Sequence, residues 1–570
     1  MILTPPDRIR EYVSNGFWGT TTIDDLFRTA VVAGRDRLAI VDAPNKPTFM
    51  DTAPLRLSWN QLADNVDRLC QRLIVAGVQR DIIIGVQLPN CVELAYLYLA
   101  AARLGFILSP FPIQYREHEL RDLIDFAGIS GFVTARSIRG HDHAAMVNGL
   151  RGELPALRFV LAWGGAAGSG IETLDDLEQS EPDRVMVAEA AGRAAVTAND
   201  IITITWTSGT EARPKGVPRN HNYWICAGTA VGQAGLLKDG DALLNPFPMV
   251  HVGSLGGMFF PWLIWRGVLV QHQPFDLNIF LQQIQDERIN YTVAPPAVLN
   301  LLIQNEELRK RFDISSLRSV GSGSAPLSPW MIRAFQEQYD ISVWNTFGSS
   351  EGCGLFGSAR DVPDPEARAH FLPRFGVKGI EWPSWVASIQ ETRLVDPETE
   401  KPITERGMPG ELRLRGALVL DAYWNAPEQT RLAFDAQGFY RTGDIFQLAG
   451  DGPVPRYYHY IGRSSEVINR GGTKISPAEI EALVDGHPKV REAAVIGVAD
   501  ERVGEVVCVV AALRENQSLT LEELLDYLRE KQIAVYKLPQ QLFVVPQLPR
   551  NPVGKVLKRE LRESHGKAAN

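Results

Sequence analysis

Short apolar, β-branched runs alternate with helical stretches along most of the chain. The strand-like runs are 82–86, 106–110, 201–205 and 291–293, and a helical stretch at 91–102 follows the first of them. Apolar strands that alternate with amphipathic helices are typical of layered α/β proteins whose sheets are largely parallel. We therefore predict an α/β fold with a large N-terminal domain that is built from several subdomains.

The pattern changes toward the C-terminus. Two strand-like runs, 493–497 and 505–513, precede a helical stretch at 519–531. This set predicts a small, separate α+β unit. We place the boundary near 463–465, which divides the chain into 1–463 and 464–570.

Composition and charge narrow the classes of function. The 570 residues carry a net charge of −9 and are 45% hydrophobic, as expected of a soluble globular protein. The acidic balance argues against a nucleic-acid partner, which needs a basic surface. The N-terminus lacks the apolar core of a signal peptide, and the apolar run 258–270 is interrupted and too short for a membrane span. We expect a cytoplasmic protein, because the cysteines show no metal-binding or disulfide spacing: Cys70, Cys91, Cys226, Cys353 and Cys508.

A loop rich in hydroxyl residues and glycine follows the strand-like run 201–205. Its backbone N–H groups, hydroxyls and lysine can surround a polyphosphate, although the same composition also suits a simple turn. It is not a Walker P-loop, because Pro214 and Gly216 stand where that motif has a glycine and a Ser/Thr. The loop reads Thr207-Ser208-Gly209-Thr210-Glu211-Ala212-Arg213-Pro214-Lys215-Gly216.

Further along, 345–351 offers an aromatic face for a purine at Phe347 and, at Glu351, a carboxylate suited to Mg²⁺. A buried aromatic and a helix cap would use the same residues. In 440–444 the carboxylate of Asp444 could accept both hydrogen bonds of a ribose diol, or simply cap a turn.

Two basic loops lie near the end of the chain. The segment 462–475 supplies Arg463, a hinge candidate at Ser465, and the glycine pair Gly471-Gly472, which lets another molecule approach the backbone. Close to the C-terminus, Lys555 follows prolines and a glycine. A cation there can neutralise a phosphate or carboxylate if the tail folds back over a site built earlier in the chain, which predicts a lid.

The order of these loops resembles the adenylate-forming superfamily, which includes acyl-CoA synthetases, aryl-acid adenylating enzymes, peptide-synthetase adenylation domains and firefly luciferase. The resemblance covers nearly the whole chain. Two further segments, 410–416 and 477–481, match family motifs at the expected places.

The resemblance implies a large N-terminal domain and a small C-terminal lid that rotates between two half-reactions. A carboxylate attacks the α-phosphate of Mg-ATP to give an acyl-adenylate and pyrophosphate, and a thiol then takes the acyl group. ATP, Mg²⁺ and coenzyme A are the implied cofactors. Such chemistry needs charge neutralisation and in-line positioning more than covalent help from the protein.

The resemblance also assigns roles to residues. Lys555 would stabilise the first transition state, Glu351 would bind Mg²⁺, and Ser465 would be the hinge. His251 would be a gate between the acyl pocket and a CoA tunnel that Gly471 and Gly472 line. The acyl pocket would include Val252, Gly253 and Gly323. The remaining residues would bind ATP: Thr207, Ser208, Gly209, Thr210, Lys215, Ser324, Phe347, Gly348, Ser350, Asp444 and Arg463.

Three positions depart from the family pattern. Glu211 and Ala212 replace the usual Thr/Ser and Gly of the phosphate loop, and an acidic group near a triphosphate repels it unless it turns outward or pairs with Arg213. Ser465 stands where the family commonly has Asp or Lys. These departures motivate an alternative, a catalytically silent acyl or nucleotide sensor, whereas the retained Lys555 argues for an enzyme.

The residue after the gate histidine bears on the substrate. In the aryl-acid branch, which 468–472 and 295–298 resemble, an asparagine there recognises the hydroxyl of salicylate-like acids, and here it is Val252. A buried valine cannot pair a phenol hydroxyl. We expect an apolar monocarboxylic acid, cyclic, aromatic or medium-chain, with CoA as acceptor. A carrier protein as acceptor is the alternative, and a homodimer is left open.

Overall fold

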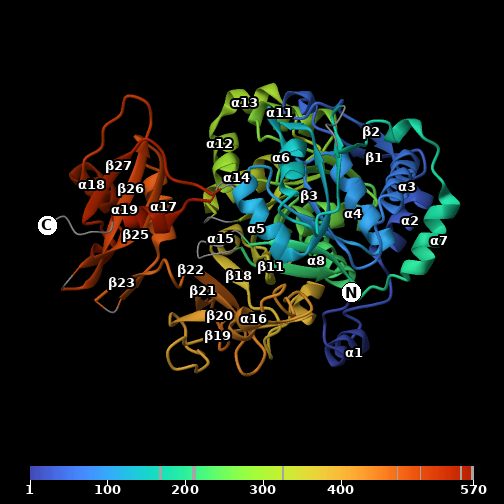
Figure 1. Cartoon of the computed structure of the whole chain (residues 1–570). Coiled ribbons are helices and arrows are strands. Elements are labelled where there is room, and N and C mark those ends of the chain that lie inside the picture. The colour runs from blue at the N-terminus through green and yellow to red at the C-terminus, as the bar shows by residue number, and fades with distance from the viewer. Residues whose placement is uncertain are drawn as a thin grey trace.

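The computed structural model describes residues 1–165, 170–207, 214–323, 327–471, 473–500, 502–551 and 555–565. Two large sheets form the body of the molecule (Figure 1). The strand order of the first is β17 (Gly352–Gly357), β16 (Ser342–Ser349), β15 (Ser319–Gly323), β14 (Tyr291–Val293), β12 (Ala242–Asn245), β13 (Val268–Gln271), β1 (Leu38–Val41) and β2 (Arg56–Ser58). That of the second is β11 (Gly216–Asn220), β10 (Ile201–Trp206), β4 (Ile107–Pro110), β3 (Ile83–Gln87), β5 (Ile129–Ala135), β8 (Phe159–Trp163) and β9 (Glu172–Thr173).

Both sheets are parallel in their interiors, and the edge strands β17, β2 and β11 run antiparallel to their neighbours. A parallel strand that is covered on both faces must be apolar along its whole length. Accordingly Ile83 and Leu244 face outer cores, whereas the adjacent Ile84 and Leu243 face the core shared by the two sheets.

Helices cover these sheets in layers. The shared core holds α2 (Ile23–Gly34), α3 (Trp59–Val75), α4 (Val92–Leu104), α8 (His221–Ala234) and α10 (Phe260–Ile264). Helix α4 has no residue on the surface: its sequence is apolar apart from Glu93 and Arg103, which are buried in ion pairs with Lys46 and Asp24. The outer face of the first sheet packs on α11 (Leu277–Asp286), α12 (Pro296–Gln304), α13 (Glu306–Arg311), α14 (Pro329–Tyr339) and α15 (Pro365–His370). The outer face of the second packs on α5 (Glu117–Ala127) and α6 (His143–Leu150).

A third, antiparallel sheet lies beside the body and leads into the C-terminal domain. Its order is β18 (Phe371–Pro373), β22 (Tyr457–Arg463), β21 (Tyr440–Ala449), β20 (Pro409–Gly416) and β19 (Gln390–Val395). The remaining elements of the large domain are α1 (Pro6–Ser14), α7 (Arg184–Ala194), α9 (Val252–Ser254), α16 (Pro427–Ala433), the hairpin β6 (Ser137–Ile138) with β7 (His141–Asp142), and the π-helical turn at Leu255–Phe259.

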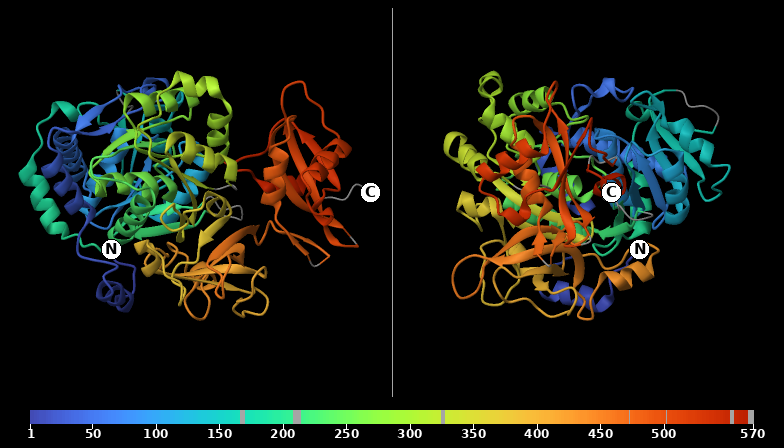
Figure 2. Two further views of the ribbon diagram at one scale, coloured as in Figure 1. Left: turned by 180° about the vertical axis from the view of Figure 1, so that it is seen from behind. Right: turned by 90° about the vertical axis from the view of Figure 1, so that its left-hand side faces the viewer.

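The C-terminal domain is a separate lobe, drawn in red in Figures 1 and 2. Its sheet has the order β24 (Thr473–Ile475), β23 (Ile468–Arg470), β26 (Gly504–Leu513) and β25 (Val490–Asp500), and β27 (Gln541–Val545) pairs with β26. One face packs on α17 (Pro477–Asp485) and α18 (Leu521–Glu530), and the other on α19 (Lys558–His565).

The predicted fold class is confirmed: a large α/β domain with mostly parallel sheets and a small α+β domain. The strand predicted at 201–205 is β10, and the run 505–513 is β26, one residue longer. The boundary at 463–465 stays a prediction. In the described part of the chain, no helix has the length and apolarity that crossing a membrane would need.

Candidate functional site

Asp444 and Arg463 face each other on the neighbouring antiparallel strands β21 and β22. The Arg463 Nε lies 2.9 Å from the Asp444 Oδ1, and Asp444 is only 2% exposed. Burial raises the pKa of Asp444 to about 6, although the charges of Arg463 and Lys555 oppose this rise. The structure therefore brings together three residues to which the sequence assigned roles.

The backbone that presents Asp444 is held by a buried carboxylate. Gly443 has a φ of +68°, a conformation that favours glycine, and its N–H donates to the Glu411 Oε1 at 3.0 Å. The Asp444 N–H donates to the Thr442 hydroxyl at 3.0 Å, and that hydroxyl donates to the Leu412 carbonyl oxygen at 2.7 Å. The turn is thus fixed by groups that belong to strand β20.

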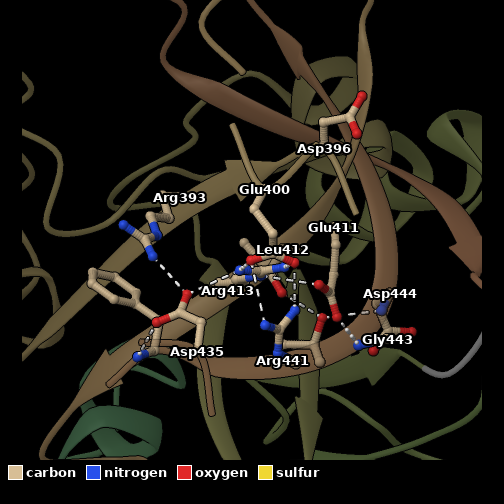
Figure 3. Close-up of polar contacts among 12 residues, drawn as sticks. Arg393, Asp396, Glu400, Glu411, Leu412, Arg413, Asp435, Arg441, Gly443 and Asp444 are labelled. Carbon is tan, nitrogen blue, oxygen red and sulfur yellow. Dashed lines mark hydrogen bonds and ion pairs between the residues drawn. The ribbon is translucent and has the colours of Figure 1, made fainter. Parts of the chain in front are cut away.

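A buried arginine holds Glu411 in turn (Figure 3). The Arg413 side chain is 1% exposed and lies 3.0 Å from Glu411, 3.0 Å from Asp435 and 2.6 Å from Glu400. A buried guanidinium is tolerated only when its donors are paired, and here three carboxylates pair it. The sequence located 410–416 as a family motif but gave these residues no role, because their partners lie far apart along the chain.

Glu351 and Lys215 meet at one tyrosine. The Tyr423 hydroxyl donates to the Glu351 Oε1 at 3.0 Å, and the Lys215 ammonium lies 5.0 Å from the centroid of the Tyr423 ring. The Thr207 N–H donates to the Lys215 carbonyl oxygen at 3.0 Å and closes the base of the predicted phosphate loop. Sequence reasoning missed Tyr423, since a tyrosine outside a motif gives no signal of a contact 72 residues away.

Between Thr207 and Lys215, the predicted contacts Ser208, Gly209 and Thr210 and the departures Glu211 and Ala212 lie outside the described residues. So do Ser324 and Gly472.

The described residues fit one mode of Mg²⁺ binding. They contain no group of three or more His, Cys, Asp or Glu side chains that could hold a metal ion. Mg²⁺ often keeps several waters and takes only one or two carboxylates beside substrate phosphates. A lone carboxylate at Glu351, near Lys215, suits that mode and would not form a cage by itself.

Phe347 lies among aromatic rings next to Asp444. Its ring centroid is 5.0 Å from that of Phe446 and 5.9 Å from that of Tyr460, and the Tyr460 hydroxyl donates to the Asp444 Oδ1 at 3.5 Å. Gly348 is exposed beside it. Phe347 is half-buried, so part of its ring packs in the protein, and its contact with a purine stays a prediction.

Gly323 and Ser350 are each held by a close contact of their backbone with another segment. A Cβ at Gly323 would lie 2.3 Å from the Thr346 carbonyl oxygen, so glycine is required where β15 pairs with β16. The Ser350 carbonyl oxygen accepts a hydrogen bond of 2.5 Å from Arg219, which fixes the backbone just before Glu351.

Lys555 is exposed and forms backbone hydrogen bonds with Asn551. Its N–H donates to the Asn551 side chain at 2.8 Å, and the Asn551 N–H donates to the Lys555 carbonyl oxygen at 2.9 Å. Desolvation by the surrounding protein and the charge of Arg463 lower the pKa of Lys555, against the charges of Glu466 and Asp444. The C-terminal lobe therefore brings this lysine within electrostatic range of Asp444.

His251 precedes the short helix α9 and lies half-buried in the large domain. Burial lowers its pKa to about 4, so the imidazole is neutral at neutral pH. A Cβ at Gly253 would lie 3.3 Å from the His251 ring, which favours a small residue there. Val252 packs against the core shared by the two large sheets.

The hinge and tunnel candidates lie at the junction of the domains and in the C-terminal lobe. Ser465 is exposed in a turn in which the N–H groups of Glu466 and Val467 donate to the Arg463 carbonyl oxygen. Gly471 is exposed, has a φ of +58°, and donates to the Val503 carbonyl oxygen at 2.7 Å. Its contacts lie within the C-terminal lobe.

Comparisons with known proteins agree with this arrangement. Residues 27–424 match the family model of the AMP-binding enzyme, and residues 479–555 match that of the AMP-binding enzyme C-terminal domain. The chain is 28% identical over 575 residues to a 2-hydroxy-7-methoxy-5-methyl-1-naphthoate–CoA ligase of Streptomyces carzinostaticus, covering 99% of this chain and 96% of that protein.

One further relative and one solved structure are similar over nearly the whole chain. The chain is 27% identical over 563 residues to the 2,3-dihydroxybenzoate-AMP ligase of Bacillus subtilis, covering 98% of this chain and 96% of that protein. The crystal structure of ATP-bound MatB from Rhodopseudomonas palustris superposes with a TM-score of 0.74 at 25% identity, over 96% of this chain and 100% of that chain.

Proposed function

The chain belongs to the AMP-binding enzyme family, and so to the adenylate-forming superfamily, and we propose that it is an ATP-dependent acyl-CoA ligase for an apolar monocarboxylic acid. The acid is cyclic, aromatic or medium-chain. The enzyme joins it to AMP and then transfers the acyl group to the thiol of CoA.

The observation that carries the substrate class is the apolar, uncharged character of the segment around His251. Val252 packs on the main core with Phe247, and His251 is neutral because burial lowers its pKa to about 4. A neutral imidazole forms no ion pair with a second carboxylate, and valine offers no hydrogen bond to a phenol hydroxyl. Both properties favour an apolar acid with a single carboxylate.

The charges around Asp444 support the adenylation step. An ionised Asp444 can accept the hydrogen bonds of a ribose diol, and Arg463 keeps its carboxylate oriented. The Lys555 ammonium, within electrostatic range of Asp444, is placed to neutralise charge that develops on the reacting carboxylate and the α-phosphate. Mg²⁺, when bound at Glu351 with the phosphates, would neutralise charge on the pyrophosphate leaving group.

The alternative function is an acyl- or aryl-AMP ligase that loads the phosphopantetheine thiol of a carrier protein. It is favoured by the resemblance of 468–472 to the aryl-acid branch and by similarity to a dihydroxybenzoate-AMP ligase at nearly the same identity as to a CoA ligase. The two functions share the adenylation step and differ in the thiol acceptor.

A panel of carboxylic acids, scored for pyrophosphate release with and without CoA, tests both the class of acid and the identity of the thiol acceptor. We expect benzoate, cyclohexanecarboxylate or octanoate to exceed salicylate, and CoA to increase turnover with formation of the acyl-CoA. Pyrophosphate release that CoA leaves unchanged would favour the carrier-loading alternative. No release with any acid would favour the nucleotide or acyl sensor.

A further inference from the structure

A buried asparagine ties together the backbone segments that lead to His251. Asn90 lies in the loop between β3 and α4 and is 1% exposed. Its Nδ2 donates to the Phe247 carbonyl oxygen at 2.8 Å, and more weakly to those of His272 at 3.3 Å and Asn245 at 3.4 Å. Its Oδ1 accepts the Met249 N–H at 2.8 Å.

The second backbone group of Met249 is held by α4, the helix that follows this loop. The Tyr98 hydroxyl, on α4, donates to the Met249 carbonyl oxygen at 2.6 Å. Tyr98 and Met249 are both fully buried. Both backbone hydrogen-bonding groups of Met249 are therefore paired with side chains from the β3–α4 unit, 151 and 159 residues away in the sequence.

Polar contacts hold this segment where apolar packing is incomplete. A hollow lined by Leu88, Pro112 and Ile113 borders the segment at Pro248 and Val250. An irregular segment beside a hollow keeps one position only if its backbone groups are fixed, because buried polar groups are costly to leave unpaired.

We propose that Asn90 and Tyr98 are positioning residues that fix where His251 and Val252 lie relative to the proposed acyl pocket. They would thereby influence the selectivity among acids and the rate of acyl transfer to the thiol. Met249 is two residues before His251, so a shift of its backbone moves the imidazole directly. The proposal rests on the function proposed for the His251 segment.

Helix α4 supplies a matched control for the test. Tyr98→Phe removes only the hydroxyl that holds Met249. Tyr96→Phe, two residues earlier, removes an equally buried hydroxyl, whose partner is the Asn65 side chain at 2.9 Å. Comparable losses in melting temperature are expected for both, since each deletes one buried hydrogen bond.

The two variants should differ in the reactions that depend on His251. In Tyr98→Phe, the ratio of kcat/KM for cyclohexanecarboxylate over octanoate should change by about fivefold, the change expected from one hydrogen bond of ordinary strength. Thioester formation from supplied acyl-adenylate should slow while the KM for ATP stays constant. In Tyr96→Phe the ratio of kcat/KM for the two acids and the rate of thioester formation should match those of the wild type.

Hydrogen–deuterium exchange of peptides covering 245–255 gives a readout that needs no activity. Exchange there should rise in Tyr98→Phe and not in Tyr96→Phe. Equal behaviour of the two variants in exchange and in acid ratio would overturn the positioning role. A wild type that forms no acyl-CoA would instead contradict the proposed function, and the exchange comparison would then decide the positioning role.

Discussion

The segment 247–251 and the pair of residues Asn551 and Lys555 are held in different ways. Met249 is fully buried, and side chains of a helix and a loop from the middle of the body pair both of its backbone groups. Lys555 is exposed, and its backbone N–H and carbonyl groups form hydrogen bonds with Asn551, four residues earlier. Both segments carry a residue to which the sequence assigned catalysis.

This difference suits the two roles that we propose. Segments with few buried contacts open at low free energy, and enzymes draw lids from them. Ion pairs near Lys555, such as Lys558 with Glu481 at 2.8 Å and with Glu466 at 3.3 Å, lie within the C-terminal lobe itself. Such partly exposed pairs are individually weak, whereas the segment before His251 is held by hydrogen bonds to buried side chains.

Removal of the mobile cation should produce the largest effect. Lys555→Ala should slow acyl-adenylate formation by about a hundredfold or more, as expected for the loss of one preorganised charge in a transition state. Thioester formation from supplied acyl-adenylate should change little, because the lysine acts only in the first lid position. The two half-reactions are measured separately by pyrophosphate release and by acyl-CoA formation.

Lys558 provides the control, since it is a nearby lysine whose ion pairs lie within the lobe. Lys558→Ala should affect the two half-reactions alike. Equal losses in both half-reactions for Lys555→Ala would remove the assigned role and, with it, the functional contrast between the two segments.

The sequence predicted the parts of the molecule that depend on local pattern. Alternating apolar strands and the helical stretch 91–102 predicted the layered fold, because periodicity is a local property of the sequence. Motif order assigned Asp444 and Arg463 to the same nucleotide, and strand register places the two residues face to face.

Long-range polar contacts could not be predicted in this way. The pairing of Arg413 with Asp435, of Tyr423 with Glu351 and of Asn90 with Met249 joins residues that only the tertiary fold brings together. Asparagine and tyrosine also occur on surfaces and in turns, so their presence in the sequence does not reveal burial.

Removal of the Glu351 carboxylate should have a somewhat smaller effect than removal of the Lys555 ammonium. Glu351→Gln removes the negative charge but keeps an oxygen that can accept the Tyr423 hydroxyl, so the fold should be spared. Loss of one charged interaction is worth about 2 kcal/mol, which is about thirtyfold in the Mg²⁺ concentration needed for half-maximal rate. Titration of Mg²⁺ at fixed ATP measures it, and an unchanged midpoint would exclude Glu351 as a ligand.

A change within the fixed segment should alter selectivity more than overall rate. Val252→Asn adds an amide next to His251, so salicylate gains a hydrogen bond while an apolar acid must desolvate the amide. We expect the ratio of kcat/KM for salicylate over benzoate to rise about tenfold, or about 1.4 kcal/mol. The affinity for ATP without acid is the control. A wild type that already prefers salicylate would contradict the pocket interpretation.

The smallest expected effect concerns protonation of Asp444, the group between the fixed body and the lid. Its pKa is raised to about 6 by burial, and Arg463, Lys555, Glu466 and Tyr460 are the groups that act on it. Because a ribose diol needs an ionised acceptor, the KM for Mg-ATP should rise about twofold between pH 7 and pH 6, and more steeply below.

Protonation of Asp444 should weaken nucleotide binding but stabilise the fold. A carboxyl group whose pKa is higher in the folded than in the unfolded state binds more protons when folded, so its contribution to stability grows as the pH falls from about 6 toward 4. Asp444→Asn removes the pH dependence that Asp444 gives to the KM for Mg-ATP and to stability. The wild type gains stability as Asp444 is protonated and the variant does not, so the melting temperature of the variant relative to wild type should be highest at pH 7 and lower at pH 5. If the KM for Mg-ATP of wild type and Asp444→Asn rises in parallel below pH 7, the acid dependence originates elsewhere, and Asp444 is not the titrating contact of the nucleotide.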